Sequence, residues 1–385
     1  MPELKVAFIG WNQFQLIHVS ELIKYIPNSV FILENKHNSL ANFDTNLLNR
    51  PDIPIIPCSS KNIHKLDNLY DVIITQTVFT DIHKFTKAKI AMIQYGYAKE
   101  AHNYGPWRSL ADICFTYGTY ATKKIDHFCP TYEVGYLRQA SVTDPLFLST
   151  AKKRYSHLIK PNKKTILYLP TWGEYSSKGQ YLDQIIAMNK KYNVLIKIHH
   201  NTDLLSLKKI KIKPTVQLLG ANDDALQLIA LSDIVISDYS GSIFDAIYCK
   251  KPVILLGPRK MILQRGKVDQ FSLEHTCRNK LGYVVNYPDL LEKQINKALR
   301  EAKSKVSASL YEYLFSENKN TYKLIHEALI KLVVDKEPTL SQQQLYIRSA
   351  MKDLYSLKYS SIRYKLLNIF QTIYSKVIRK NKQNK

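Results

Sequence analysis

A short polar turn near residue 240 combines residue types that bind phosphate. Ser237–Ser242 separates Ile234–Ile236, a β-branched run typical of a buried strand, from apolar residues at helical spacing. Backbone N–H groups at a helix N-terminus attract anions, and hydroxyls there donate further hydrogen bonds. Ser240, Gly241 and Ser242 therefore predict a phosphate site, in which the glycine lets a ligand approach the backbone. The alternative is a serine that only caps the helix.

Two acidic residues accompany this turn. Asp238 is expected to orient a histidine or a serine, or else to act as a helix cap. Asp245 lies within the following helix, where it reaches a donor hydroxyl or simply meets solvent.

Further polar loops follow other buried runs. These runs are Ile90–Gln94, Tyr132–Tyr136, Thr165–Leu169 and Val194–Ile198. The polar residues on or after them are Tyr95, Glu100, His102, Arg138, Thr171, Trp172, Lys197, His199 and His200. Because open parallel sheets bind ligands beyond the carboxyl ends of their strands, we expect these loops to converge on one cleft.

Several of these side chains have two interpretations. His199 either donates to a phosphate oxygen at neutral pH or is structural. Arg138 either grips a phosphate with two parallel hydrogen bonds or forms a surface ion pair. Trp172 either stacks on a base or belongs to a core.

The elements that position these residues repeat a strand-then-helix pattern. This pattern predicts an α/β fold with two doubly wound, Rossmann-type domains that face a cleft. The expected parts are residues 1–145, a linker at 146–163, a second domain at 164–337 and a basic helical tail at 338–385. A dinucleotide site is disfavoured, because the segment after Ile9 lacks the second and third glycines of that fingerprint.

The composition limits the partners. A formal net charge of +23 points to a phosphate-bearing substrate, an anionic membrane or nucleic acid. Five cysteines without paired spacing are typical of reduced cytosolic residues and show no metal pattern. We expect no signal peptide and no transmembrane helix.

The last 45 residues are strongly basic. Residues 341–385 contain ten Lys or Arg and one acid, Asp353, and an apolar stripe that includes Leu366, Phe370 and Val377. This pattern predicts an amphipathic helix on an anionic membrane; the alternative is a helix packed across the two domains.

Taken in order, the polar loops resemble the CDP-glycerol glycerophosphotransferase family of teichoic-acid and capsule synthesis, which has a two-Rossmann GT-B fold. The similar segments are Gly135–Arg138, Leu169–Trp172, Ile196–His199 and Ser237–Asp245, where the family has GYPR, APTW, KxHP and TDYSSxxFD. The resemblance covers residues 90–285, and the last motif is the most specific.

This resemblance implies transfer of glycerol- or ribitol-phosphate from a CDP-alcohol to an acceptor hydroxyl, with release of CMP and without a metal or other cofactor. It implies that His199, Ser240 and Ser242 contact the donor pyrophosphate and that Asp245 touches the polyol or ribose. The N-terminal domain would bind the acceptor and the C-terminal domain the nucleotide.

The chain departs from the family at three places. Tyr95 stands where the family has the histidine that is its proposed general base, and tyrosine is a poorer base at neutral pH. Either Glu100 or His102 substitutes for it, or the donor differs. His200 and Leu137 replace prolines of the family motifs.

The leading hypothesis is thus a cytoplasmic transferase, peripheral to the inner face of the bacterial membrane, with a lipid-linked or saccharide acceptor and no nucleic-acid partner. One alternative is a GT-B glycosyltransferase that uses a nucleotide sugar. Another is a non-catalytic protein that binds nucleic acid or membrane, prompted by the charge of +23.

Overall fold

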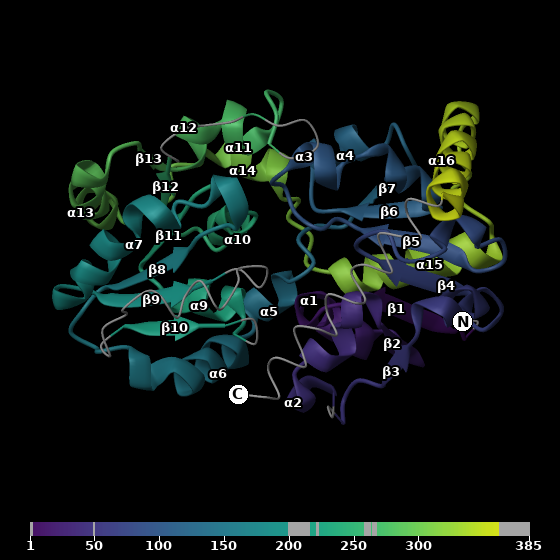
Figure 1. Ribbon diagram of the computed structural model, residues 1–385, viewed down its shortest axis with the longest axis horizontal. Coiled ribbons are helices and arrows are strands. Elements are labelled where there is room, and N and C mark those ends of the chain that lie inside the picture. The colour runs from purple at the N-terminus through teal and green to yellow at the C-terminus, as the bar shows by residue number, and fades with distance from the viewer. Residues whose placement is uncertain are drawn as a thin grey trace. The chain divides into compact units, whose positions relative to one another are not determined.

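The chain divides into two compact units. The computed structural model describes residues 3–48, 51–198, 216–220, 223–257, 263 and 268–361. The first unit contains Met1–Tyr95, Gly105–Leu137 and Asn318–Lys385, and the second contains Gly96–Tyr104 and Arg138–Glu317. Each unit is built around one parallel sheet with helices on it, which confirms the predicted class of two doubly wound α/β domains (Figure 1).

The first sheet has seven strands in the order β3-β2-β1-β4-β5-β6-β7. They are β1 (Val6–Gly10), β2 (Ser29–Glu34), β3 (Ile55–Cys58), β4 (Val72–Thr75), β5 (Lys89–Ile93), β6 (Ile113–Thr116) and β7 (Thr131–Glu133). Every residue of β1, β4 and β6 is buried, as expected for strands that are covered on both faces. β1 pairs with both β2 and β4, so the strand order reverses there.

Helices and 3₁₀ segments complete the first unit. They are α1 (Gln13–Tyr25), η1 (Lys36–Asn42), α2 (Thr45–Leu48), η2 (Ser60–Asn68), η3 (Ile82–Lys84), η4 (Pro106–Leu110), α4 (Thr119–Ile125), α15 (Thr321–Val334) and α16 (Gln342–Ser360). Asn12 caps α1, because its side chain accepts a hydrogen bond from the Gln15 backbone N–H at 2.9 Å. The Tyr25 and Tyr322 rings, 5.8 Å apart, join α1 to α15.

The start of the predicted basic tail packs on the first unit. α16 begins with a capping box formed by Ser341 and Gln344. Arg348 anchors it, with Nε donating to the Ser109 carbonyl at 2.6 Å and Nη1 to the Asp112 carboxylate at 2.9 Å. Residues 342–360 are therefore part of the first unit rather than a separate tail. The apolar stripe at Leu366–Val377 lies outside the described residues.

The second sheet has six strands in the order β10-β9-β8-β11-β12-β13. They are β8 (Thr165–Leu169), β9 (Asn193–Lys197), β10 (Gln217–Leu219), β11 (Ile234–Ser237), β12 (Val253–Leu256) and β13 (Tyr283–Val285). All neighbours are parallel, and β8, β9 and β11 lie where apolar runs predicted them.

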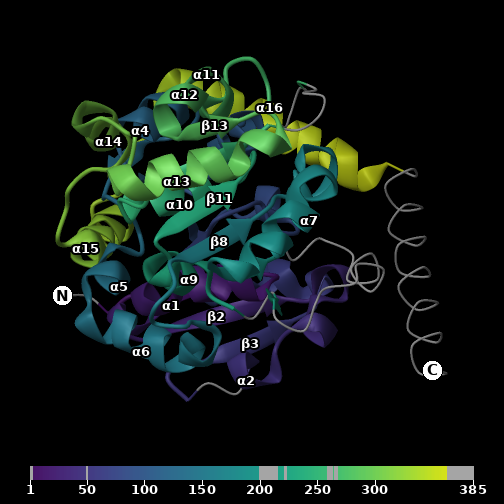
Figure 2. The same cartoon turned by 90° about the vertical axis from the view of Figure 1, so that its left-hand side faces the viewer.

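The helices of the second unit cover both faces of this sheet. The elements are α3 (Glu100–Asn103), α5 (Gln139–Thr143), α6 (Pro145–Tyr155), η5 (Ser156–Leu158), η6 (Gly173–Tyr175), α7 (Lys178–Ala187), η7 (Met188–Lys190), α9 (Ala225–Leu231), α10 (Ser242–Tyr248), α11 (Leu273–Thr276), α12 (Arg278–Leu281), η8 (Pro288–Leu290), α13 (Leu291–Glu301) and α14 (Ala308–Leu314). α7 and α13 pack on one core with Ile166, Ile236 and Ile254 of the sheet (Figure 2).

The observed units differ from the predicted domains at three boundaries. The main part of the second unit begins at Arg138, and residues 146–155 of the predicted linker lie in α6 (Pro145–Tyr155), whose N-cap is Asp144. Residues 318–337 belong to the first unit, not the second. The segment 96–104 leaves the first sheet after β5 and belongs to the second unit, which the order of the sequence does not indicate.

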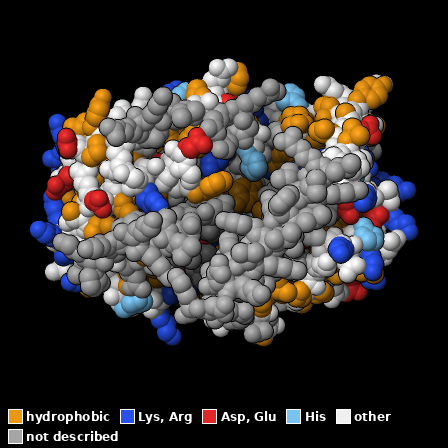
Figure 3. All heavy atoms as spheres, in the orientation of Figure 1, with side chains coloured by type: hydrophobic (Ala, Val, Ile, Leu, Met, Phe, Trp, Pro, Cys, Tyr) orange, Lys and Arg blue, Asp and Glu red, His pale blue; other side chains and the backbone are white. Residues whose placement is uncertain are grey.

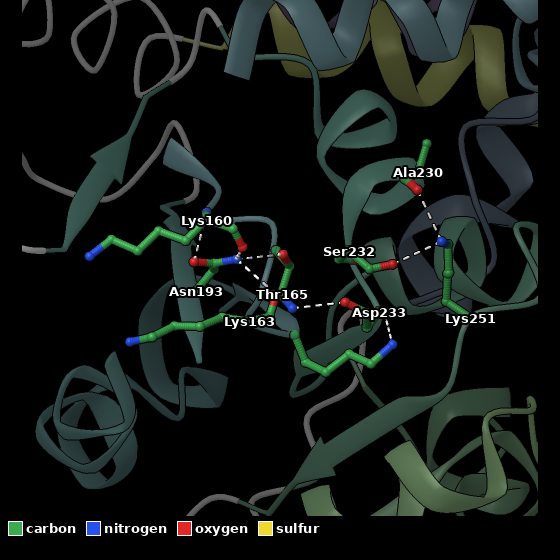
Figure 4. Close-up of polar contacts among 9 residues, drawn as sticks. Lys160, Lys163, Thr165, Asn193, Ala230, Ser232, Asp233 and Lys251 are labelled. Atoms are coloured by element: carbon green, nitrogen blue, oxygen red, sulfur yellow. Dashed lines mark hydrogen bonds and ion pairs between the residues drawn. The ribbon is translucent and has the colours of Figure 1, made fainter. Parts of the chain in front are cut away.

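The amino ends of β8, β9 and β11 are fixed by a polar network (Figure 4). Asn193 donates to the carbonyls of Lys160 and Lys163 at 2.9 and 3.0 Å, and Asp233 accepts the Thr165 backbone N–H at 2.8 Å. Lys251 Nζ donates to the last carbonyls of α9, those of Ala230 and Ser232, at 3.0 and 2.8 Å. This network lies at the sheet end opposite to the predicted ligand loops.

Replacing Lys251 with methionine is expected to lower the unfolding free energy by about 1–2 kcal/mol, because two carbonyls at the end of α9 lose their donor. Chemical denaturation followed by circular dichroism measures this. Lys293→Met on the exposed side of α13 is the control and should leave the unfolding midpoint unchanged. Equal midpoints for the two variants would contradict the capping role.

Charge is spread over the described surface. On the face drawn in Figure 3, Lys and Arg side chains lie mainly along the margins and are not gathered into one patch among the coloured residues. Within the described ranges, no helix is both long enough and apolar enough to span a bilayer.

Candidate active site

The serine turn joins β11 to α10, and Gly241 rather than a serine occupies the N-cap position of α10. The alternative interpretation, a serine that only caps the helix, is therefore not supported. The Ser240 hydroxyl accepts from the Ser242 backbone N–H at 3.4 Å and from the Ser242 hydroxyl at 3.0 Å. Gly241 is exposed, and no atom lies within 4 Å of a Cβ placed on it. The backbone of the turn is therefore open to a ligand, and both hydroxyls lie beside it.

Asp238 is fully buried and holds the neighbouring loop rather than a ligand. Its carboxylate accepts the backbone N–H groups of Thr171 and Ser177 and the Ser177 hydroxyl, each at 2.8 Å. Complete burial raises the pKa of Asp238, while these hydrogen bonds lower it. Asp238 thus orients a serine, one of its two predicted roles, and fixes the loop that follows β8.

Arg278 stabilises the corner of the second unit where the loops after β8 and β11 meet. It was not among the predicted site residues. Its guanidinium donates to the carbonyls of Asp238 at 3.3 Å and Leu256 at 2.8 Å, at the carboxyl ends of β11 and β12. It also lies 4.1 Å from the centre of the Tyr239 ring. A single arginine in a polar segment carries no sequence signal for such a role.

The segment 96–104 brings a second loop to this corner. Lys99 Nζ donates to the Thr171 hydroxyl at 3.3 Å and lies 5.6 Å from the centre of the Trp172 ring. Trp172 is 41% exposed, so it is not a core residue. The predicted convergence of these two loops is confirmed within the second unit. Lys99 adopts a left-handed conformation, with φ of 59°, which is uncommon for a residue other than glycine.

Two buried glutamates form hydrogen bonds between this segment and α11. The Lys99 backbone N–H donates to Glu274, and the Leu273 backbone N–H donates to Glu100, both at 2.6 Å. Burial, helped by the charge of Glu100 and opposed by the hydrogen bond from Lys99, raises the pKa of Glu274 to about 7. Glu274 was not predicted as a site residue. Glu100, a predicted substitute base, accepts a backbone amide here, and its role as a base stays a prediction.

Arg138 and Lys197 contact protein groups at the ends of β9 and β10. Arg138 forms two parallel hydrogen bonds with Asp224, the N-cap of α9, at 2.8 and 2.5 Å, so its fork binds a carboxylate here. Lys197 Nζ donates to the Gly220 carbonyl at 2.8 Å, and burial lowers its pKa. A phosphate-binding role for either residue stays a prediction.

The remaining predicted residues fall in different places. His199 and His200 lie outside the described residues. Tyr95 is half-buried in the first unit, where its ring meets Phe14 edge-on at 5.7 Å. His102 is exposed on α3, and Asp245 is half-buried in the first turn of α10.

The described residues hold no group of three or more His, Cys, Asp or Glu that would bind a metal. This corner presents hydroxyls, an open backbone, an exposed Trp172 and the Lys99 ammonium. Such groups can bind a phosphate and stack on a base, which is positioning and charge stabilisation rather than covalent chemistry.

Comparison with known proteins finds a family match that includes this corner. Residues 142–281 match the family model of CDP-Glycerol:Poly(glycerophosphate) glycerophosphotransferase. The matched segment contains Asp238, the serine turn and Glu274.

Curated relatives match over part of their length. The chain is 31% identical over 114 residues to the teichoic acid poly(glycerol phosphate) polymerase of Bacillus spizizenii, which is 26% of this chain and 28% of that protein. It is 28% identical over 139 residues to the teichoic acid glycerol-phosphate primase of Bacillus subtilis, 34% of this chain and 35% of that protein. The matches thus span about a third or less of those relatives.

Solved structures show the fold over most of the chain. The wall teichoic acid polymerase TagF has a TM-score of 0.59 at 17% identity, with 88% of this chain and 91% of that chain covered. UDP-GlcNAc 2-epimerase of Methanocaldococcus jannaschii has a TM-score of 0.61 at 13% identity, with 84% and 99% covered.

Proposed function

We propose that this protein transfers glycerol phosphate, or a closely related polyol phosphate, from a CDP-alcohol to an acceptor hydroxyl in the synthesis of a surface glycopolymer. The single observation that carries the proposal is the family match across residues 142–281, which includes the serine turn. The relatives named above polymerise or prime teichoic acid, and TagF has been soaked with CDPG.

The geometry supports a donor site at the corner of the second unit. The Ser240 and Ser242 hydroxyls and the open backbone at Gly241 suit a diphosphate. Trp172 is exposed enough to stack on a base, and Lys99 adds a positive charge beside it. His199, which resembles a family site residue, belongs to the same proposal.

CMP release tests this function directly. The full chain is incubated with CDP-glycerol, CDP-ribitol and a panel of nucleotide sugars, and nucleotide products are separated by chromatography. We expect CMP from a CDP-alcohol and no nucleoside diphosphate from the sugars. Release from sugar donors alone would instead support a glycosyltransferase that uses a nucleotide sugar. Anabaena HepE, solved in complex with UDP-glucose, has a TM-score of 0.53 at 12% identity to this chain.

We also propose that the protein lies on an anionic membrane surface through its C-terminal end. The outward side of α16 exposes Tyr346, Leu354 and Leu357, at 67%, 55% and 68%, and the sequence after it adds seven Lys or Arg by residue 385. These apolar residues recur at helical spacing, on the side opposite to Arg348.

Truncation after Ser361 tests the membrane proposal while leaving α16 in place. Each Lys or Arg near an anionic surface contributes about 1 kcal/mol, so the truncated chain should lose most of its sedimentation with phosphatidylglycerol vesicles. Neutral phosphatidylcholine vesicles serve as the control. Undiminished sedimentation of the truncated chain would rule out this role for residues 362–385.

A further inference from the structure

The first sheet carries a polar cluster at the point where its strand order reverses. β1 and β4 lie side by side there, and ligands of open parallel sheets bind beyond the carboxyl ends of such strands. Directly after β4, the side chain of Gln76 is 2% exposed. Its Nε2 lies 2.5 Å from Nδ1 of His18, a buried residue of α1. A buried amide and imidazole therefore meet at the expected ligand position.

Gln76 has an unused acceptor. Within the described part of the chain, its Oε1 is buried and has no hydrogen-bond partner. A buried acceptor without a donor costs about 1–3 kcal/mol, so a bound group that donates a hydrogen bond would be stabilised there. With Nδ1 of His18 as the unprotonated ring nitrogen, Nε2 of Gln76 donates to it, and Oε1 is left for a donor such as a hydroxyl.

Gln15 holds the two loops around this cluster. Its Oε1 accepts the Trp11 backbone N–H at 2.8 Å, and its Nε2 donates to the Thr77 hydroxyl at 3.2 Å. Gly10 permits this approach, because a Cβ there would lie 3.0 Å from Gln15 Oε1 and 2.9 Å from the Phe31 ring. The loops after β1 and β4 are thus joined to one another through Gln15.

Aromatic rings and one ammonium surround the cluster. Phe14 stacks on His18 at 5.2 Å and meets Tyr95 at 5.7 Å. Lys36 Nζ lies 5.6 Å from the centre of the Trp11 ring, and burial lowers the pKa of Lys36 while the charge of Glu34 raises it. Rings of this kind pack against the C–H faces of polyols, and a desolvated ammonium is favoured by an anion.

We propose that this switch-point cluster (Trp11, Gln15, His18, Lys36 and Gln76) binds a polyol phosphate, with a polyol hydroxyl donating to Gln76 Oε1 and the phosphate near the Lys36 ammonium. His18 is a positioning residue that orients the Gln76 amide. The inference deepens the proposed function, on which the choice of ligand rests: the cluster would receive the hydroxyl-bearing acceptor. It requires no contact with the second unit.

Binding measured without a nucleotide donor tests the site. Isothermal titration of glycerol 3-phosphate into the full chain should give a Kd that Gln76→Met raises at least tenfold, because methionine keeps the volume and removes the acceptor. Gln184→Met is the matched control. Gln184 in α7 also has a buried Oε1 without a partner in the described ranges, and its Nε2 donates to the Pro288 carbonyl at 2.7 Å. This control should change the Kd less than twofold.

Lys36→Met is a second variant that should also weaken binding at least tenfold, and its half-buried position makes loss of folding a smaller risk. Unaltered binding in Gln76→Met, or no binding by the wild-type chain, would overturn the inference. Neither result touches the proposed function, which fails only if the wild-type chain releases no CMP from any CDP-alcohol.

Discussion

Asp238→Asn is expected to lower the free energy of unfolding by about 2–4 kcal/mol and to reduce CMP release at least tenfold. The carboxylate accepts three hydrogen bonds, from Thr171 and Ser177, and it is fully buried. An asparagine amide places an N–H group against one of these donors, so a buried N–H loses its acceptor. The change also removes the negative charge that faces Arg278, which is itself buried.

Urea denaturation and a CMP-release assay on the same preparation measure both effects. Asp183→Asn is the matched control: it makes the same chemical change at an exposed position of α7. It should leave midpoint and rate unchanged. If Asp238→Asn unfolds at the wild-type urea concentration, the carboxylate does not hold the loop after β8.

Glu274→Gln is expected to remove a pH dependence of stability. The pKa of this carboxyl is raised from 4.5 to about 7, so the folded chain prefers its neutral form. The stabilisation is complete below pH 4.5 and is lost as the pH rises through about 7. At 1.4 kcal/mol per pKa unit the loss amounts to about 3 kcal/mol, which glutamine, always neutral, would not show.

The charged and titratable groups that act on Glu274 are Glu100, Lys99, Arg278 and Tyr239. The measurement is the unfolding free energy of wild type and variant at half-unit steps from pH 4.5 to 8.5, taken as a difference. Glu312→Gln, at an exposed position of α14, controls for the loss of a carboxylate. A wild-type-minus-variant difference that stays flat with pH would show that Glu274 does not titrate in this range.

The strands could be predicted from the sequence because each is a short apolar run with polar ends. The run at Thr165–Leu169 agrees residue for residue with β8, whereas the run at Tyr132–Tyr136 is found as Thr131–Glu133. Strand ends depend on pairing partners that the local pattern does not contain. The linker prediction failed for a local reason: Asp144 and Pro145 start a helix in a segment whose basic composition resembles a linker.

The candidate site could be predicted only in part. The serine turn and the loop at Thr171 follow strands, so the order of elements indicates their position. Glu274 and Arg278 lie in a charged segment that resembles any solvated surface, and only tertiary packing buries them. Asp238 was predicted to bind the donor. Its carboxylate is buried and accepts backbone N–H groups of the loop after β8.

The second unit is discontinuous, since Gly96–Tyr104 enters it from the middle of the first. A fragment cut at 138–317 would be missing the amide that Glu274 binds and the carboxylate that caps Leu273. Attempts to express the second unit alone should therefore include residues 96–104 through a fused linker. Without them, a failure to fold or bind would say little about the chemistry of this unit.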